Sequence, residues 1–289
     1  MATYNRRQFI SRVASTTAAG MAAAGLVSMP SALNTAWAAE APSKSPLKLG
    51  VQLYSLRGLP VDKALQASQE LGFEQVELFG GMLPIDASPE QIAEMKAKVA
   101  DLGMTISAHG VNPFGKDFAA NRKTFEFAKA LGVRNISADP EPESFANLDD
   151  LVKEFDIRVA IHNHGPRARY NKVVDVLNAI DGHDERIGSC ADLGHYIRSG
   201  EQPTDVIRLL KGRLYGIHLK DFAEMKEKTK GVILGQGHLN VGDVFASLIK
   251  VGFPADGALS LEYEENPQDP IADIRQCVEV SKKALKNLS

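Results

Sequence analysis

The sequence predicts an α/β protein built as a single (β/α)8 barrel, and three observations lead to this prediction. Eight short apolar segments alternate with segments of helical periodicity through most of the 289 residues. The alternation occupies roughly 240 residues, close to the ~250 residues of a typical barrel of this kind. No glycine-rich phosphate loop follows the first apolar segment, which argues against the alternative, a doubly wound open sheet.

The apolar segments are brief, and several are bounded by Gly or Pro, as is typical of buried parallel strands. We expect strands at Lys48–Leu53, Gln75–Phe79, Thr105–His109, Asn135–Ala138, Arg158–His162, Ile187–Ala191, Leu214–His218 and Ala258–Glu262.

Helical segments lie between these strands. Ser88 followed by Pro89 predicts a helix start, because Ser is a good N-cap and Pro fits the first helical position. This helix should continue to Leu102 and stop at Gly103. A second helix should run from about Asn121 to Leu131, just before another glycine.

Residues 1–38 have the pattern of an export signal. Arg6 and Arg7 stand before an apolar pair, which resembles a twin-arginine signal. A weakly apolar run rich in Ala and Gly follows, and a small-residue cleavage site ends at Ala38. The run falls short of the ~20 strongly apolar residues of a membrane span, so we expect no stable membrane anchor.

This signal sets the expected domain organisation and location. Residues 39–46 are a short polar linker, and residues 47–289 form the barrel. The expected partner in export is the twin-arginine machinery, and the expected location is periplasmic or otherwise exported. A homo-oligomer is compatible with the sequence.

The charge of the chain argues against a nucleic-acid partner. There are 33 Lys and Arg against 36 Asp and Glu, giving a net charge of −3. Removing the signal takes away three arginines and no acidic residue, so the remaining 251 residues carry −6. An acidic protein of this kind lacks the basic surface that binds phosphate backbones. Two cysteines, Cys190 and Cys277, cannot form a disulfide framework.

Residues able to bind a metal gather at the predicted strand ends, where the active sites of such barrels lie. They are Glu77, His109, His162, Asn163, His164, Asp192, His195, His218, Lys220, Asp221, Glu262 and Glu264. A buried carboxylate is costly unless it is paired or bound to a metal. Two His and two carboxylates form a mixed nitrogen and oxygen set that suits Mn, Co, Fe or Zn better than Ca. We therefore expect one bound divalent metal, with Mn favoured.

At this point the motifs resemble a known family. KLGVQLYSLR, VELFG, DLGH, HLKD, SLEYE and GQGHLNVGDVFASLIKVGF together resemble the xylose isomerase-like TIM-barrel superfamily of sugar phosphate isomerases and epimerases, over residues 47–285. The resemblance implies one divalent metal held at the ends of strands five to eight. Its ligands here would be Asp192, His218, Glu262 and one residue of strand five.

Strand five departs from the family pattern. Sugar 3-epimerases of the family have a Glu at this point, whereas this chain has His162-Asn163-His164. Strand alternation puts the two histidines on one side. His162 is the expected ligand by alignment, and His164 is the alternative. The change removes the pair of Glu residues used in simple 3-epimerisation, and it resembles members acting as inosose dehydratases or 3-ketoglycoside lyases.

The resulting prediction is a metal-dependent isomerase or epimerase that removes a proton next to the carbonyl of a ketosugar or related polyol. The expected catalytic residues are Glu262, His164, His195 and Lys220. The expected substrate contacts are Tyr54, Glu77, His109 and Arg198.

Three alternatives stay open at this stage. The same enolate chemistry could serve a dehydratase or a 3-ketoglycoside lyase. The missing strand-five Glu also fits a non-catalytic sugar-binding barrel or a subunit of a larger complex. An endonuclease-four-like nuclease is disfavoured by the acidic charge and by the absence of a further D-x-H between Asp221 and Gly235.

Overall fold

The computed structural model describes residues 47–288, and these residues form a closed eight-stranded barrel. Each barrel strand is parallel to its two neighbours, in the order β1-β10-β7-β6-β5-β4-β3-β2. The strands are β1 Gly50–Gln52, β2 Gln75–Leu78, β3 Thr105–Phe114, β4 Asn135–Pro140, β5 Arg158–His162, β6 Ile187–Asp192, β7 Leu214–Leu219 and β10 Ala258–Leu261. The predicted fold is confirmed.

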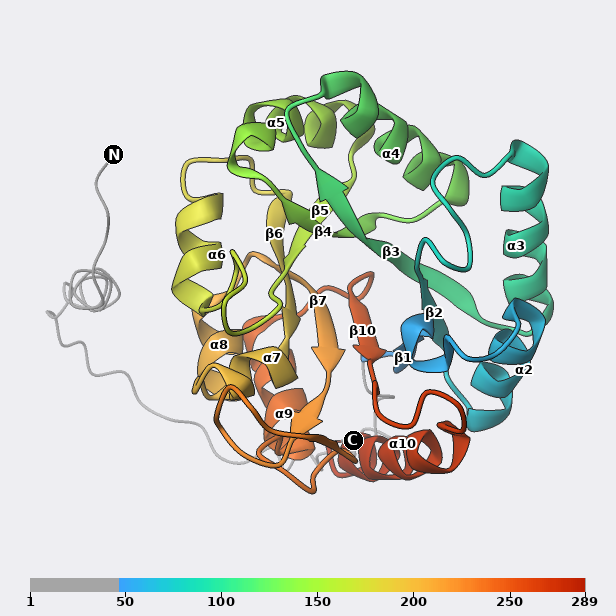
Figure 1. The fold of residues 1–289 in the computed structure, drawn as a ribbon, viewed down its shortest axis with the longest axis vertical. Helices are drawn as coiled ribbons and strands as arrows, with labels where there is room; N and C mark the ends of the chain where they lie inside the picture. Colours follow the sequence, from blue (N-terminus) through green and yellow to red (C-terminus); the bar gives the residue numbers. More distant parts are fainter. Residues whose placement is uncertain (1–46, 289) are drawn as a thin grey trace, which may run out of the picture. The chain divides into compact units, whose positions relative to one another are not determined.

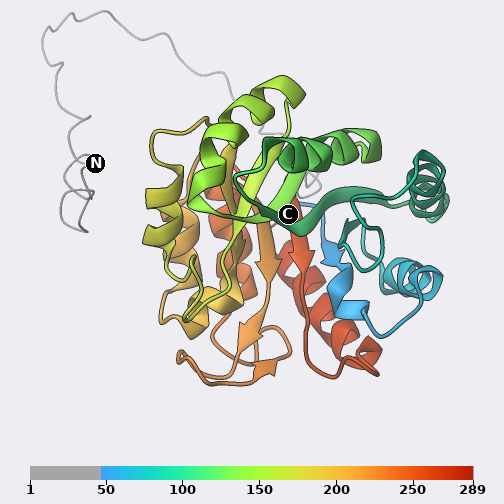
Figure 2. The ribbon, with the colours of Figure 1, turned by 45° about the horizontal axis from the view of Figure 1, so that its top comes forward.

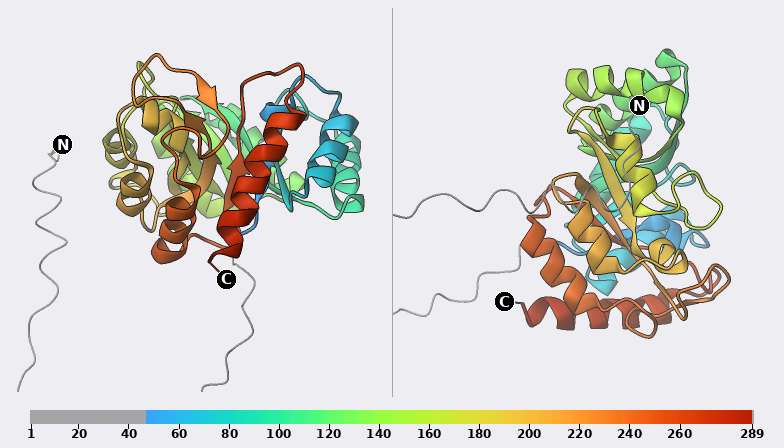
Figure 3. Two further views of the ribbon diagram at one scale, coloured as in Figure 1. Left: turned by 90° about the horizontal axis from the view of Figure 1, so that it is seen from below. Right: turned by 90° about the vertical axis from the view of Figure 1, so that its left-hand side faces the viewer.

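Helices surround the strands on the outside (Figure 1). They are α2 Val61–Leu71, α3 Pro89–Asp101, α4 Phe118–Leu131, α5 Phe145–Phe155, α6 Val173–Ile180, α7 Leu193–Arg198, α8 Pro203–Leu209, α9 Val241–Val251 and α10 Ile271–Lys286. Two short 3-10 helices cover Leu53–Leu56 and Pro142–Ser144. The main hydrophobic core is continuous and joins the buried strand residues to the inward faces of the helices. The last helix, α10, packs beside the first, α2, and closes the ring (Figure 3).

All eight predicted strands are present, but their ends differ. The first strand is shorter, because Leu53 already belongs to a 3-10 helix. The third is longer and continues past His109 to Phe114 along β4. A two-stranded hairpin, β8 Asp221–Phe222 with β9 Gly231–Val232, lies beyond the end of β7 and was not predicted (Figure 2).

The capping signals in the sequence work as expected in α3. Ser88 Oγ accepts from the Gln91 amide at 3.3 Å, and the Gln91 side chain accepts from the Ser88 amide at 2.8 Å. Helix α4 begins at Phe118, earlier than predicted. The reason is that Asp117 caps it by accepting from the amides of Ala119 and Ala120.

The parallel arrangement decides where the functional residues lie, because all strand C-termini point to one end of the barrel. Asp192 pairs in register with His218 across β6 and β7, and His218 pairs with Ser260 across β7 and β10. The predicted signal and linker, residues 1–46, lie outside the described residues. Within residues 47–288, no helix has both the length and the apolar composition needed to cross a membrane.

Candidate metal centre and active site

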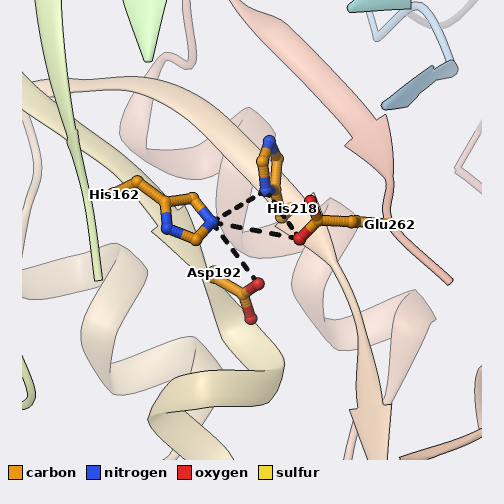
Figure 4. Close-up of side chains that lie close together, drawn as sticks. All are labelled: His162, Asp192, His218 and Glu262. Carbon is orange, nitrogen blue, oxygen red and sulfur yellow. Dashed lines mark hydrogen bonds and ion pairs between the residues drawn. The ribbon is translucent and has the colours of Figure 1, made fainter. Parts of the chain in front are cut away.

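Four residues predicted as metal ligands converge at the C-terminal end of the barrel. We call His162, Asp192, His218 and Glu262 the strand-end cluster. They come from the ends of β5, β6, β7 and β10, and all four are buried. One ligand atom from each lies within 4.8 Å of the others, and the side chains point toward one another (Figure 4).

The distances within the cluster are short. His162 Nε2 lies 3.0 Å from His218 Nδ1, 3.6 Å from Asp192 Oδ2 and 3.9 Å from Glu262 Oε2. His218 Nδ1 lies 3.1 Å from Glu262 Oε2. The structure thus brings His162, and not His164, into this cluster.

Asp192 is held in place by its position between a strand and a helix. Its Oδ1 accepts from the His195 amide at 2.7 Å and caps α7. The Asn163 side chain bonds the Asp192 backbone in both directions, at 3.1 and 2.8 Å. Oδ2 is therefore left to face the cluster. Among the described residues its nearest partner is the Lys220 ammonium at 2.8 Å, while the His162 and His195 rings lie farther away, at 3.6 and 3.8 Å.

Lys220 places a positive charge beside both carboxylates of the cluster. Its Nζ lies 2.7 Å from Glu262 Oε2, 2.8 Å from Asp192 Oδ2 and 3.3 Å from Glu264 Oε1. Burial alone would lower the pKa of Lys220, but the three carboxylates outweigh burial and raise it. The ammonium is therefore charged at neutral pH.

The same contacts keep the carboxylates ionised. Burial favours the neutral acid, yet His195 and Lys220 hold the pKa of Asp192 well below its usual value. Burial also opposes ionisation of Glu262, but Lys220 and His218 lower the pKa of that group. Two ionised carboxylates in one buried place require cations close by.

Glu77 lies underneath His218 and not at the cavity. Its Oε2 lies 3.1 Å from His218 Nε2 and accepts from Ser260 Oγ at 2.7 Å, while Oε1 accepts from Ser137 Oγ at 2.6 Å. Burial would raise the pKa of Glu77, but the charge and hydrogen bond of His218 lower it. The side chain has no exposed surface. The structure thus favours a role in orienting His218 over the predicted substrate contact.

His109 is also used by the protein itself. Its Nε2 lies 2.8 Å from the Leu83 carbonyl oxygen, and its Nδ1 lies 3.2 Å from the Asn112 amide. The ring packs edge-on against Phe127. Desolvation by burial lowers the pKa of His109, so the imidazole is neutral. This geometry does not bring it to the cavity, and its role is to fix the loop after β2.

His164 and His195 both lie beside His162, with their own rings 6.2 Å apart, as the sequence led us to expect for groups near the cluster. Their rings are 4.6 Å and 6.0 Å from the His162 ring. Burial is the main cause that lowers the pKa of His164 to about 4 and that of His195 to about 3. Both are neutral at pH 7 and can accept a proton. His195 stacks on Phe222, while the His164 side chain is 41% exposed.

The other two predicted substrate contacts lie near the mouth of the barrel. Tyr54 is partly exposed, packs edge-on against Phe79 and lies under the Arg57 guanidinium. Arg198 covers the Phe222 ring and donates to the Glu227 carbonyl oxygen at 3.2 Å.

A cavity of about 250 Å³ opens beside the cluster. Its wall includes Arg198, Lys220, Phe222, Thr229, Glu262 and Glu264. A second hollow of about 430 Å³, at Lys116 and Arg169, includes no cluster residue. The first cavity is therefore the candidate substrate site.

The role of Glu264 was missed from the sequence, whereas Asp221 was expected to cap a helix or turn. Glu264 was listed among the strand-end residues without a role, yet it faces Lys220 from the cavity wall. Asp221 is buried and receives five backbone hydrogen bonds of 2.8–2.9 Å, from the amides of Phe222, Gly235, Gly237, His238 and Leu239. The glycine-rich segment GQG was the available signal for this loop, because amides of that kind need an acceptor.

The strand-end cluster fits a divalent metal. It supplies two imidazoles and two ionised carboxylates, the mixed donor set that suits Mn, Fe, Co or Zn. The His218 nitrogen that faces away from the cluster contacts the Glu77 carboxylate, as the outer nitrogen of a metal-bound histidine does. Asp192 Oδ2 also faces the cluster, and its nearest partner in the described part of the chain is the Lys220 ammonium at 2.8 Å.

Comparison with known proteins gives curated relatives with different activities. The chain is 28% identical over 170 residues to a 3-oxo-isoapionate decarboxylase of Pectobacterium atrosepticum, covering 53% of this chain and 60% of the relative. It is 24% identical over 136 residues to an inosose dehydratase of Clostridium botulinum, covering 42% of this chain and 45% of that enzyme. The matches thus span less than two thirds of each relative.

Solved structures show the same fold. An uncharacterised protein of Parabacteroides distasonis has a TM-score of 0.64 at 29% identity, covering 82% of this chain and 99% of that one. A D-psicose 3-epimerase has a TM-score of 0.62 at 13% identity, covering 83% and 98%. The xylose isomerase-like TIM barrel family matches residues 65–284. This match covers most of the chain, so the protein belongs to the xylose isomerase-like TIM barrel family.

Proposed function

We propose that this protein is a divalent-metal-dependent enzyme that removes a proton from the carbon next to the carbonyl of a ketosugar or related keto-polyol. The observation that carries the proposal is the strand-end cluster, with the Lys220 ammonium beside it at the wall of a cavity. The relatives are named as a decarboxylase and a dehydratase, and a structural neighbour as an epimerase. All three kinds of reaction can pass through an enolate, formed by loss of a proton in an epimerase or dehydratase and by loss of CO₂ in a decarboxylase.

The four residues of the strand-end cluster would hold the metal. A divalent ion bound there would supply Lewis acidity to a carbonyl oxygen and so make the neighbouring C–H more acidic. Nothing in the donor set restricts the choice beyond Mn, Co, Fe and Zn, and Mn is the working choice.

The protein's own residues would handle the proton. Glu262 is ionised at the cavity wall and can accept it, and neutral His164 is the alternative acceptor. The electron pair of the broken C–H bond moves to the carbonyl oxygen, where the charged Lys220 ammonium stabilises it. The group that accepted the proton, Glu262 or His164, can then return it, with neutral His195 beside it as a hydrogen-bond partner for the substrate. Return to another carbon or face gives isomerisation or epimerisation.

A second outcome is supported by the residue at the end of β5. His162 stands there, so the cluster contains a single Glu and lacks the pair expected for a two-carboxylate epimerase. Unlike acid and base groups suit the loss of a β-leaving group from this enolate. Loss of CO₂ from a β-keto acid would instead form an enolate directly, because the electrons of the broken C–C bond move to the ketone oxygen, and an acid group would then protonate the carbon. We therefore propose elimination or decarboxylation as the alternative to epimerisation.

Solvent exchange tests the proposal directly. The protein, loaded with Mn²⁺ for activity and Zn²⁺ for NMR, is incubated in D₂O with ketohexoses, inososes, 3-ketoglycosides and β-keto sugar acids. We expect deuterium to enter one carbon next to the carbonyl of the true substrate, and the product names the reaction. Absence of exchange and turnover across the panel, with metal bound, would favour the non-catalytic sugar-binding alternative.

Matched variants show whether any exchange arises at this site. Glu262→Gln should slow the exchange by about 10²–10⁴-fold. Glu126→Gln changes the same chemical group on the exposed face of α4, where it pairs only with Arg122 among the described residues, and should leave exchange unchanged. Equal activity in both variants would overturn the proposed site.

Export by the twin-arginine route remains a proposal, because it depends on residues 1–38. Replacing Arg6 and Arg7 together by Lys should retain the full-length precursor in the cytoplasm of a host with this pathway. Cell fractionation and N-terminal sequencing of the exported form would test both the route and cleavage after Ala38.

A further inference from the structure

The Lys220 ammonium shares its carboxylate partners with the strand-end cluster. Its Nζ contacts Asp192 Oδ2 and Glu262 Oε2, the two oxygens that also face the histidines. The third partner, Glu264, stands outside the cluster and is 38% exposed in its side chain. The ammonium thus lies between a candidate metal site and an acceptor at the cavity wall.

The part of the Lys220 side chain nearest the backbone is tightly packed. It leaves the end of β7 and passes over Gly194 in the first turn of α7. A Cβ on Gly194 would lie 2.6 Å from Lys220 Cγ and 2.7 Å from its Cβ, so only glycine leaves room for this path. Nζ already lies 2.8 Å from Asp192 Oδ2 and 3.3 Å from Glu264 Oε1, so a shift from the first partner to the second is short.

A divalent ion and an ammonium cannot share the same two oxygens without strong repulsion. We propose that Lys220 neutralises Asp192 and Glu262 in the metal-free protein, and that Glu264 takes over its ammonium when a divalent ion binds. This inference rests on the metal-binding part of the proposed function. Glu264 is then a positioning residue, and the internal ion pair sets the metal affinity.

The exchange also places Lys220 for the reaction. Both Lys220 and Glu264 line the cavity beside the cluster. Pairing with Glu264 would therefore keep the ammonium at the cavity wall in the loaded protein, next to the position of a substrate oxygen. Binding of the metal would therefore also place the Lys220 ammonium where it can contact the substrate.

Mn²⁺ affinity in a double-mutant cycle tests the inference without using activity. The proteins are wild type, Lys220→Met, Glu264→Gln and the double variant, titrated with Mn²⁺ by calorimetry and by electron paramagnetic resonance. Lys220→Met should tighten Mn²⁺ binding by on the order of tenfold, because it removes a competing cation. Glu264→Gln should weaken binding several-fold in wild type and should have little effect once Lys220 is absent.

A matched neighbour separates this coupling from a general charge effect. Glu265 lies next in the chain, accepts from the Gly231 amide at 2.9 Å and also lines the cavity, but has no ion pair with Lys220 in the described structure. Glu265→Gln should shift Mn²⁺ affinity equally with and without Lys220. Weaker binding in Lys220→Met, or an effect of Glu264→Gln that is the same in both backgrounds, would overturn the inference.

A measurement on the unmutated side chains guards against variants that fail to fold. Reductive methylation with ¹³C-formaldehyde labels the lysines, and Lys220→Met identifies the Lys220 signal where that variant folds; otherwise Lys220→Arg identifies it. Loading with diamagnetic Zn²⁺ should shift this signal in wild type and make the amine more reactive. An unchanged signal at full Zn²⁺ occupancy would contradict the exchange. Failure of wild type to bind any divalent ion would instead reject the metal site itself.

Discussion

Two buried aspartates at neighbouring strand ends have opposite surroundings. Asp192 lies at the end of β6. Its Oδ1 accepts a hydrogen bond from the His195 amide in α7, and its Oδ2 faces Lys220 and the cluster. Asp221, just beyond β7, has both oxygens filled by five backbone amides. The first carboxylate keeps an oxygen available for an ion, whereas the second holds a loop together.

The supply of donors within the fold, and not the residue type, separates a binding carboxylate from a structural one. The loop after β7 returns amides of Gly235 and Gly237 to Asp221. A Cβ on Gly237 would lie 2.1 Å from the Phe222 carbonyl oxygen, so this close return requires glycine. Changes at the cluster should therefore alter chemistry, and changes at Asp221 should alter loop order and stability.

The largest effect is expected at the cluster. Glu262→Gln keeps the size of the side chain but removes its charge and its capacity as a base, so kcat/KM should fall by about 10²–10⁴-fold. Chelation of the metal should abolish activity in wild type, and added Mn²⁺ should restore it. Steady-state kinetics on the substrate found by exchange checks both results. An unchanged kcat/KM in Glu262→Gln would remove the distinction between the cluster and the Asp221 loop.

Much of this cluster was predictable because it depends on a rule about strand ends. In a parallel barrel, residues that close each strand meet at one end, which predicted that Asp192, His218 and Glu262 share one face. The resemblance to the family then selected these three as ligands from the longer set of strand-end residues. Strand alternation could not decide between His162 and His164 as the fourth ligand, because both side chains lie on the same side of an extended chain.

The surrounding contacts were not predictable in the same way. Glu77 reaches His218 across the barrel interior, 141 residues along the chain, and meets Ser260 on a third strand. His109 binds a carbonyl in the loop after β2, a contact that no strand pattern encodes. Such roles depend on strand register and loop path, which local propensity does not determine.

The next largest effect should fall on stability, at the other aspartate. Asp221→Ala leaves five amides without their acceptor, and we expect a loss of about 3 kcal/mol in the free energy of unfolding, since water can replace part of the bonding. Urea denaturation measures it. Faster hydrogen exchange should be confined to residues 222–239.

Asp221→Asn provides the matched control. Its carbonyl oxygen can still accept from three amides, but its NH₂ would face the amides of Gly235 and Gly237, so the loss should be smaller. Mn²⁺ affinity should stay within a few-fold of wild type in both variants. A collapse of Mn²⁺ affinity in a folded Asp221→Asn protein would show that the two regions are one unit.

A smaller effect should follow from Glu77→Gln, which changes the layer beneath the cluster. The amide is nearly the same size as the carboxylate, but it is uncharged and interacts more weakly with the outer nitrogen of His218. Mn²⁺ affinity should therefore fall by about 10–100-fold. Calorimetric titration measures it, and the Co²⁺ absorption spectrum should shift because the His218 ring turns. If affinity and spectrum both match wild type, Glu77 has only a packing role.

The smallest effect should come from the serines that support Glu77. Ser260→Ala removes the hydroxyl that donates to Glu77 Oε2 at an Oγ–Oε2 distance of 2.7 Å. The contacts of Glu77 with the Ser137 hydroxyl and the His218 ring remain. Because the acceptor is a buried carboxylate, we expect a cost of about 1–2 kcal/mol in the free energy of unfolding. The shift in Mn²⁺ affinity should be well below that of Glu77→Gln, since the charge beside His218 is kept.

Ser137→Ala is the natural comparison, because the Ser137 hydroxyl donates to Glu77 Oε1, the oxygen that does not touch His218. Ser260→Ala should thus weaken Mn²⁺ binding more than Ser137→Ala does, at a similar cost in the free energy of unfolding. If Ser137→Ala weakens Mn²⁺ binding more, then Glu77 Oε2 is not the atom that links Glu77 to the cluster.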